Sequence, residues 1–387
     1  ITDKEFKSPQ LGQFNKIIDA KVTGDHTLVL ITDGPYPPLL AQLVKLSIVP
    51  EAYVTRVGDE QFNRNPIGSG PYKFSEWQRG VKIVLEANSD YWRGTPSFAT
   101  VEFQAVKDGA TRIANLNTGS ADIIVAVSPD QAPEIKAANG IKVLSSPTER
   151  VGYMMMNTQF GPLADVRVRK AIAHGLDRQL IIDALLGGYG EVVSQLLTPA
   201  HFGWVDGIPT LPYDPDKARA LLKEANYNSD DVLVLNTSTR FSQQLNQAVQ
   251  QQLAEIGVTM KIEVSDHPTY LSRRTARPEG FGGFAIGRWS CACQDADGVL
   301  YAMFHSSSKW SKYNNAEMDA LLEAARSTLD ETVRMENYKK IHEHIYQNVP
   351  SIPVYQVTSI YGAQDSLNWT PTANESMFVM DMSWTGD

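Results

Sequence analysis

The chain has 387 residues, of which 42% are hydrophobic and 20% are charged, and its formal net charge is −9. This length predicts two or three domains, and the composition is that of an ordinary globular protein. The negative charge, without any basic run, argues against nucleic acid as a partner. No stretch reaches the roughly 18 uninterrupted apolar residues that a membrane-spanning helix needs. The first residue, Ile1, is neither a methionine nor part of a signal-like segment, which indicates a processed chain or a fragment.

Hydrophobic periodicity predicts four helices outside the central region of the chain. Residues 164–186 are expected to form a single helix that is capped near Asp165. Residues 214–227 predict a second helix, with Asp214 at the N-cap and Pro215 at the first helical position. Residues 316–330 and 332–349 predict a pair of helices that ends before Pro350.

Residues 232–289 alternate between strand-like and helix-like patterns. Strands are expected at 232–236, 259–264 and 283–289, and helices at 242–257 and 267–277. This β-α-β-α-β order predicts parallel strands covered by helices. In such sheets, ligands bind outside the carboxyl ends of the strands. Two of these ends are TSTRF at 237–241 and SCACQDADG at 290–298, so both segments are candidate ligand-binding sites.

Three side chains near these strand ends suit a binding site. Arg240 follows the first strand and directly precedes a helix, where a guanidinium and free helix N–H groups together favour an anion. The alternative is an ordinary surface arginine at the start of a helix. Trp289 and Tyr153 can line a cleft as rigid apolar walls.

The second strand end contains two acids and both cysteines of the chain. Asp295 and Asp297 either cap the following turn, with Gly298 easing the backbone, or form a pair of catalytic acids in a hydrolase. Cys291 and Cys293 point to opposite faces if the segment is extended, so the spacing predicts packed thiols and no disulfide. No further donors stand at ligand spacing, and the strong enzyme signatures are absent, so neither a metal nor a cofactor is expected.

Five segments together resemble a known family and occur in its order. They are NPIGSGPYKFSEW (65–77), the stretch from LEANSDYW to GSADI (85–123), NTQFGPLADVRVRKAIAHGLDRQLI (157–181), YDPDKARALLKEANY (213–227) and VPSIPVYQ (349–356). The chain resembles the extracytoplasmic solute-binding proteins of peptide/nickel-type ABC importers, which are the dipeptide- and oligopeptide-binding proteins. Members usually carry further residues before the position that matches Ile1, so the resemblance implies a truncated or processed chain.

The resemblance implies a two-lobed α/β fold of the periplasmic-binding-protein kind, similar to type II, with mixed sheets flanked by helices. Lobe I would comprise 45–148 and 357–387, with 1–44 in an extra subdomain of that lobe, and lobe II would comprise 149–356. The hinge would lie near 147–151 and 355–358. Such proteins perform no chemistry: they close over a solute and deliver it to a membrane permease. A monomer that acts in the periplasm, or anchored outside the cytoplasmic membrane, is therefore expected.

The resemblance also assigns roles to individual residues. Arg240 matches the arginine that pairs with the carboxylate of the ligand in the dipeptide binders, and Arg277 matches a cleft-side arginine of the oligopeptide binders. Trp289 matches the tryptophan that opens the ligand-contacting strand end, which makes its neighbours Ser290 and Cys291 further candidate contacts.

The pattern departs from the family at Ala292. Peptide binders carry there an aspartate that pairs with the free α-amino group of the ligand, and a buried ammonium needs such a counter-charge. Either Asp295 takes the ammonium, or the ligand has no free amine in this place. The main expectation is a peptide or peptide-like solute, and an opine, a sugar or a metal chelate is the alternative. A sensor or chaperone variant of the same fold also remains open.

Overall fold

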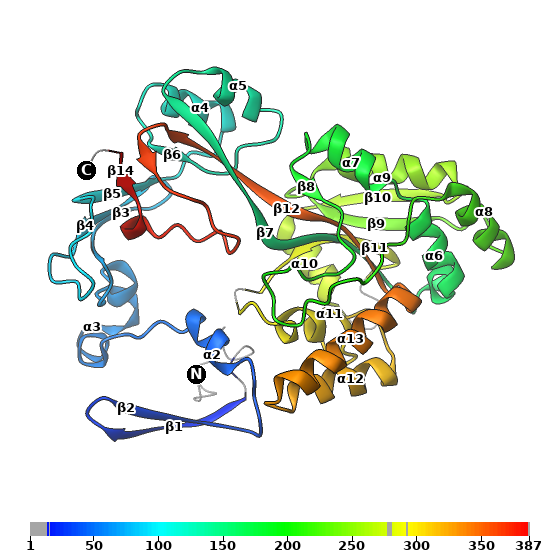
Figure 1. Ribbon diagram of the computed structural model, residues 1–387, viewed down its shortest axis with the longest axis horizontal. Coiled ribbons are helices and arrows are strands. Elements are labelled where there is room, and N and C mark those ends of the chain that lie inside the picture. Colours follow the sequence, from blue (N-terminus) through cyan, green and yellow to red (C-terminus); the bar gives the residue numbers. More distant parts are fainter. Residues whose placement is uncertain (1–13, 15, 277–280, 292, 386–387) are drawn as a thin grey trace. The chain divides into compact units, whose positions relative to one another are not determined.

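The computed structural model describes residue 14 and residues 16–276, 281–291 and 293–385. Contacts divide the chain into two compact units. Unit 1 comprises the residues up to Lys45 together with Glu149–Val357, and unit 2 comprises Leu46–Thr148 and Thr358–Asp387. Two long strands, β7 (Ile141–Met156) and β12 (Ser351–Gln364), carry the chain from one unit into the other (Figure 1).

The N-terminal segment groups differently from the expectation. Residues 1–44 were expected with lobe I, but the segment that ends at Lys45 groups with Glu149–Val357. Two contacts explain this grouping: Ala41 packs against the hydrophobic core of unit 1, and Lys45 Nζ donates a hydrogen bond to Cys291 Sγ at 3.5 Å. The expected lobe II, 149–356, and the second segment of unit 1 differ by one residue at the carboxyl end.

The sheet that forms the centre of unit 1 contains the predicted β-α-β-α-β order. Strands β9 (Leu233–Ser238) and β10 (Met260–Ser265) are parallel, and so are β9 and β11 (Gly283–Trp289). Helices α9 (Gln243–Glu255) and α10 (His267–Thr275) connect them. The strand order continues from β11 to β7, which is antiparallel to it, and then to β12, which also pairs with the short β8 (Gly190–Glu191). The α/β prediction is confirmed.

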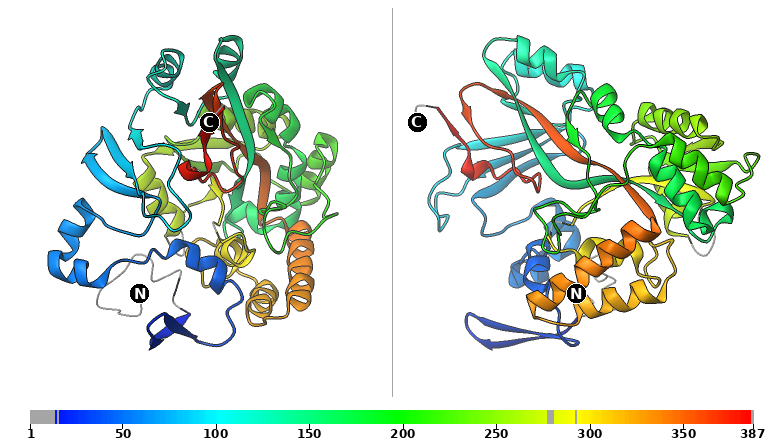
Figure 2. Two further views of the ribbon diagram at one scale, coloured as in Figure 1. Left: turned by 60° about the vertical axis from the view of Figure 1, so that its left-hand side comes forward. Right: turned by 45° about the vertical axis from the view of Figure 1, so that its right-hand side comes forward.

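Side chains of β7 alternate between two hydrophobic cores. Met154 and Met156 pack with helices on one face, and Tyr153 and Met155 pack with helices on the other. This period of two is the geometry of a strand that is covered on both faces. The first face carries α6 (Val166–His174), α7 (Arg178–Leu185), α8 (Pro215–Glu224) and α9. The second carries α10, the turn η3 (Asp297–Tyr301), α11 (Ala302–Phe304), α12 (Ala316–Arg326) and α13 (Glu331–Asn348) (Figures 1 and 2).

The single helix expected at 164–186 is wrong, because two helices occupy this stretch. Helix α6 ends at Gly175, where an added Cβ would lie 2.6 Å from Ile256 Cδ1. Asp177 then starts α7 by accepting a hydrogen bond from Leu180 N at 2.9 Å. The other helix predictions are confirmed: Asp214 caps α8 through Lys217 N, and the α12–α13 pair ends before Pro350.

Unit 2 has a three-stranded antiparallel sheet, formed by β3 (Tyr72–Gln78), β4 (Lys82–Ala87) and β5 (Thr100–Gln104). Its helices are α3 (Glu51–Arg64), α4 (Gly109–Asn117) and α5 (Ala132–Ala137). The short β6 (Ile123–Ile124) pairs with the end of β12, and β13 (Leu367–Asn368) pairs with β14 (Ser383–Trp384). A small core gathers near the carboxyl end, built from Tyr361, Ala363, Leu367, Trp369 and Met382.

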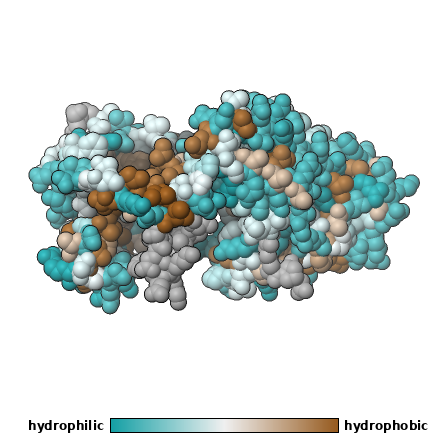
Figure 3. Space-filling model, turned by 90° about the horizontal axis from the view of Figure 1, so that it is seen from below, coloured by the Kyte–Doolittle hydropathy of each residue, from teal (hydrophilic) through white to brown (hydrophobic). Residues whose placement is uncertain are grey.

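The N-terminal part of unit 1 is a hairpin of β1 (Ile17–Gly24) and β2 (Thr27–Thr32), followed by α2 (Leu39–Gln42) and η1 (Leu43–Lys45). The hairpin exposes apolar side chains, among them Val22 and Leu28. On the face of the molecule shown in Figure 3, hydrophobic residues gather in patches on a mostly hydrophilic surface. Within the described ranges, no helix combines the length and the apolar character that a membrane crossing requires.

The burial of a histidine, His342, predicts that unit 1 loses stability as the pH falls. His342 in α13 is 2% exposed, its Nε2 lies 3.0 Å from Gly203 O, and burial lowers its pKa to about 4. A histidine with a depressed pKa stabilises the fold above its unfolded pKa, and this contribution is lost as the pH falls towards the folded pKa. His342→Gln should therefore reduce the loss of unfolding free energy between about pH 7 and about pH 5 by roughly 2 kcal/mol. Urea denaturation at several pH values measures this loss, and the exposed His26→Gln, expected to leave it unchanged, is the control.

Candidate functional site

A pocket in unit 1 opens at the carboxyl ends of β9 and β11, where the α/β order places a ligand. Its empty space of about 320 Å³ includes open solvent at the mouth. Its walls come from β7, β11, β12 and the first turn of α9. The lining residues are Gly152, Tyr153, Phe241, Ser242, Leu245, Asn246, Ile286, Gly287, Arg288, Val354 and Tyr355.

Two glycines that line this pocket each lie under a tyrosine ring, on opposite faces of the sheet. A Cβ at Gly152 would lie 2.7 Å from Tyr355 Cε1, and a Cβ at Gly287 would lie 2.7 Å from Tyr153 Oη. In the β7–β11 register, Gly287 pairs with Tyr153 and Arg288 pairs with Gly152. The absence of side chains at these two positions therefore leaves room for one ring over each glycine. Tyr153, which was predicted as a cleft wall, lines this pocket.

Arg240 lies beside the pocket and is exposed. Its backbone N–H donates to Ser238 Oγ at 3.2 Å, at the end of β9. The next residue, Phe241, lines the pocket, and Ser242 caps α9 by accepting a hydrogen bond from Leu245 N. The guanidinium of Arg240 has no ion-pair partner within the described residues. Its location is compatible with both interpretations of this arginine.

Trp289 ends β11 and faces the second core of unit 1. Its ring packs edge-to-face against Trp310 with centroids 5.1 Å apart, and its Nε1 donates to Gly298 O at 3.3 Å. It is not among the residues that line the pocket, and neither is the half-buried Ser290 that follows it. Tyr153 and the neighbour of Arg240 therefore both line the pocket, while Trp289, which shares a face of the sheet with the Tyr153 side chain, does not.

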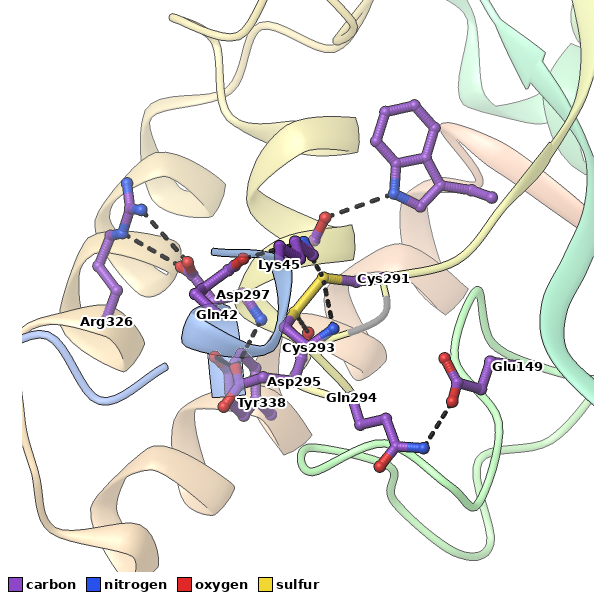
Figure 4. The surroundings of a disulfide bond; sticks show 12 residues. Gln42, Lys45, Glu149, Cys291, Cys293, Gln294, Asp295, Asp297, Arg326 and Tyr338 are labelled. Carbon is purple, nitrogen blue, oxygen red and sulfur yellow. Dashed lines mark hydrogen bonds and ion pairs between the residues drawn. A yellow bond between two sulfur atoms is a disulfide. The ribbon is translucent and has the colours of Figure 1, made fainter. Parts of the chain in front are cut away.

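Cys291 and Cys293 form a disulfide, so the prediction of packed free thiols is wrong (Figure 4). The prediction assumed an extended segment, but β11 ends at Trp289. The chain then turns: Gln294 N donates to Cys291 O at 2.8 Å, and Gln294 has a positive φ of 48°. This turn places both sulfur atoms on the same side of the segment. Both cysteines are buried.

The disulfide lies between the N-terminal segment and β7. Gln42 Oε1 and Cys291 Sγ both accept hydrogen bonds from Lys45 Nζ, and burial lowers the pKa of this lysine. On the other side, Gln294 Nε2 donates to Glu149 Oε1 at 2.5 Å. Figure 4 shows both groups of contacts around the disulfide. Because Glu149 is the first residue of unit 1 on β7, this turn is tied to the strand where the chain enters the unit.

Asp295 and Asp297 are structural acids. Asp295 is 5% exposed and accepts two hydrogen bonds from Arg334 Nη2, at 2.8 and 2.9 Å. Asp297 is 6% exposed and lies 3.1 Å from Arg326 Nε; burial raises the pKa of this aspartate, and the arginine opposes the shift. Asp295 Oδ1 also accepts a hydrogen bond from the backbone N–H of Asp297, so the capping interpretation holds for Asp295 at this turn, whereas η3 has no side-chain cap and Asp297 pairs with Arg326.

This arrangement corrects two expectations about the acids. Asp295 cannot serve as the partner of a ligand ammonium, because its carboxylate is already paired with a buried guanidinium. The hydrolase interpretation loses its basis for the same reason, since both carboxylates are committed to ion pairs. The negative charge of Asp297 also affects Tyr36. Burial and this nearby charge raise the pKa of Tyr36 to about 12.

Two predicted site residues, Arg277 and Ala292, lie outside the described residues. Three others were missed: Arg288, Asn246 and Tyr355 all line the pocket. Arg288 directly precedes Trp289, so the strand end identified from the sequence contained the signal for it. Asn246 lies inside a helix and Tyr355 lies on a distant strand, and no motif marks either of them. Across the described residues, no group of three or more His, Cys, Asp or Glu side chains could hold a metal ion.

Comparison with known proteins identifies the family. The family model described as "Bacterial extracellular solute-binding proteins, family 5 Middle" matches residues 1–311. The chain belongs to this family. It is 27% identical over 359 residues to the dipeptide-binding protein of Escherichia coli K12, with 88% of this chain and 66% of that protein covered. It is 30% identical over 360 residues to the glutathione-binding protein GsiB of Salmonella paratyphi A, with 88% and 69% covered.

A solved structure has the same fold. The ABC transporter substrate-binding protein CtaP of Listeria monocytogenes superposes with a TM-score of 0.87 at 26% identity, over 99% of this chain and 81% of that one. This likeness confirms the expected two-lobed binding-protein fold with a mixed sheet and flanking helices. The chain spans about two thirds of the length of the curated relatives that it matches.

Proposed function

We propose that this family member is the solute-binding component of an ABC importer, that it captures a peptide or peptide-like solute, and that it delivers the solute to a membrane permease. The proposal places the protein outside the cytoplasm, as a monomer that performs no chemistry. The observation that carries it is the pocket at the carboxyl ends of β9 and β11, which has aromatic walls and an arginine at its edge. Pockets of this kind, apolar with few polar groups, hold small ligands by burial and fix their orientation by hydrogen bonds.

Two further observations support a peptide-like solute over an opine, a sugar or a metal chelate. The two curated relatives reported above are a dipeptide binder and a glutathione binder. Arg240 stands exposed beside the pocket, where it could pair with the terminal carboxylate of a peptide, and a guanidinium binds such a group through two parallel hydrogen bonds. We place the ligand contacts of the proposal at Arg240 and at the pocket-lining Tyr153.

Arg240→Gln should weaken the binding of peptides that have a free terminal carboxylate by about 10- to 100-fold, which is the loss of one charge-assisted contact. Isothermal titration calorimetry with pools of di- and tripeptides measures the effect. C-terminally amidated twins of the same peptides should bind the wild type weakly and should be insensitive to the substitution. Arg219→Gln, which changes another exposed arginine of unit 1, is the matched control and should leave both affinities unchanged.

Native mass spectrometry of freshly purified protein tests the solute class independently. A retained mass that corresponds to a peptide supports the proposal. If peptide pools neither bind nor raise the melting temperature, while an opine, an oligosaccharide or a nickel chelate does, the peptide version fails and the alternative solute class replaces it. Formation of a new product from a bound peptide would contradict the non-enzymatic part of the proposal.

A further inference from the structure

The pocket contains an unpaired positive charge that the sequence did not single out. Arg288 is the charged residue among those that line it, and no acidic side chain lines the described pocket. Arg288 is exposed and directly precedes Trp289, the last residue of β11, and its guanidinium has no hydrogen-bond or ion-pair partner within the described residues. An unpaired guanidinium at the edge of an apolar pocket favours an anionic group, and Arg suits a carboxylate because its donors form a planar fork.

A second polar group of the same pocket also lacks a partner. Asn246 is 0% exposed, and its Nδ2 donates to Thr237 Oγ1 at 3.1 Å and to Gln243 Oε1 at 3.2 Å. These contacts fix the orientation of the amide, because Gln243 Oε1 can only accept. Asn246 Oδ1 has no hydrogen-bond partner among the described residues, and a buried acceptor of this kind is rare in folded proteins. It is therefore available to an N–H or O–H donor.

The surroundings favour an anion at this place. Ser242 is the N-cap of α9 and Asn246 lies in its first turn, and the amino end of this 13-residue helix carries partial positive charge. The rings of Phe241 and Tyr355 supply apolar surface next to Arg288, and surroundings of low polarity strengthen an ion pair. The two unpaired groups of the pocket are thus a cation and an acceptor, held on rigid elements.

We infer that this pocket is a subsite for an acidic side group of the solute, with a carboxylate on Arg288 and a neighbouring N–H or O–H donor on Asn246 Oδ1. The inference rests on the proposed function and names its substrate class: peptide-like molecules with a second acidic group besides the terminal carboxylate.

The test compares two peptide pools that differ in a single side-chain group. Tripeptides with a glutamate at one position are measured by isothermal titration calorimetry against isosteric twins with glutamine there, both with free terminal carboxylates. The wild type should bind the glutamate pool at least about tenfold more tightly. Arg288→Gln should abolish this preference while retaining the affinity for the glutamine pool, and Arg288→Lys should restore part of it. Arg273→Gln, an exposed arginine of α10, is the control and should keep the full preference.

A second measurement concerns Asn246 and needs no substitution in the protein. Methylation of the amide nitrogen of the glutamate residue removes its N–H donor, and this change should weaken binding by about five- to tenfold. Equal binding of both pools by the wild type would overturn the inference and leave the proposed function standing. Binding of neither pool would overturn the proposed function itself. A preference for glutamate that survives Arg288→Gln would show that the acidic group is held elsewhere, which also overturns the inference.

Discussion

Replacing Gly298 with alanine is expected to lower the free energy of unfolding by about 3 kcal/mol or more, at the upper end of the range for overpacking. A Cβ at Gly298 would lie 2.3 Å from Cys291 Sγ and 2.7 Å from Cys293 Sγ. Neither sulfur can turn away, because the disulfide holds both in place. The new methyl group must therefore displace the turn after β11 or the start of η3. Urea denaturation followed by circular dichroism measures the loss.

Two controls isolate the cause of this loss. Gly68→Ala introduces the same methyl group where nothing lies within 4 Å, and it should change the stability by less than about 0.5 kcal/mol. In a Cys291→Ala/Cys293→Ala background, Gly298→Ala should cost less than half as much as in the wild type, because both sulfur atoms are gone. An equal cost in both backgrounds would contradict the steric explanation.

The strands and helices of unit 1 could be predicted because their signals are local. Apolar runs, the caps at Asp214 and Asp165, and the stop before Pro350 all lie within one element and need no distant partner. The same local logic failed at Gly175, the C-cap of α6, which packs closely against Ile256 at the end of α9. That contact joins residues far apart in the sequence, which periodicity cannot show.

The candidate site was predictable in position and only partly in composition. The β-α-β-α-β order pointed to the ends of β9 and β11, and the pocket lies beside them, although no described residue of 290–298 lines it. Its polar groups depend on details that appear only in three dimensions. Asn246 matters because one of its amide atoms is unpaired, and Arg288 matters because Gly152 stands opposite it in the sheet.

The disulfide is another feature that the sequence pattern could not predict. The rule that i and i+2 side chains point apart holds for extended backbone. The turn at Gln294, just past the end of β11, removes that condition, and a positive φ at a residue other than glycine cannot be read from the sequence. The assignment of Asp295 to the ligand was wrong because its true partner is distant in the sequence. Arg334 stands 39 residues away, on a helix that no motif links to Asp295.

Replacing Arg334 with methionine is expected to lower the free energy of unfolding by about 3–5 kcal/mol, which is the typical cost of breaking a buried ion pair. Arg334 is 4% exposed and donates to both carboxylate oxygens of Asp295. Its Nε also donates to Ala325 O at 3.1 Å, and its guanidinium lies 4.4 Å from the ring centroid of Phe202. Methionine fills most of the volume but leaves a buried carboxylate without a counter-charge, and Asp297 nearby adds a second negative charge. Urea denaturation near pH 7 measures the loss.

The companion variant tests whether the uncompensated charge is the cause. Adding Asp295→Asn to Arg334→Met removes the orphaned charge and should recover at least half of the lost stability, because a neutral amide is far cheaper to bury than a carboxylate. Arg219→Met is the surface control: Arg219 and Asp216 form an exposed pair within α8, whose loss should cost less than about 1 kcal/mol. If the double variant is no more stable than Arg334→Met alone, the stability comes from the packing of the arginine against Phe202 and Tyr338 and not from its charge.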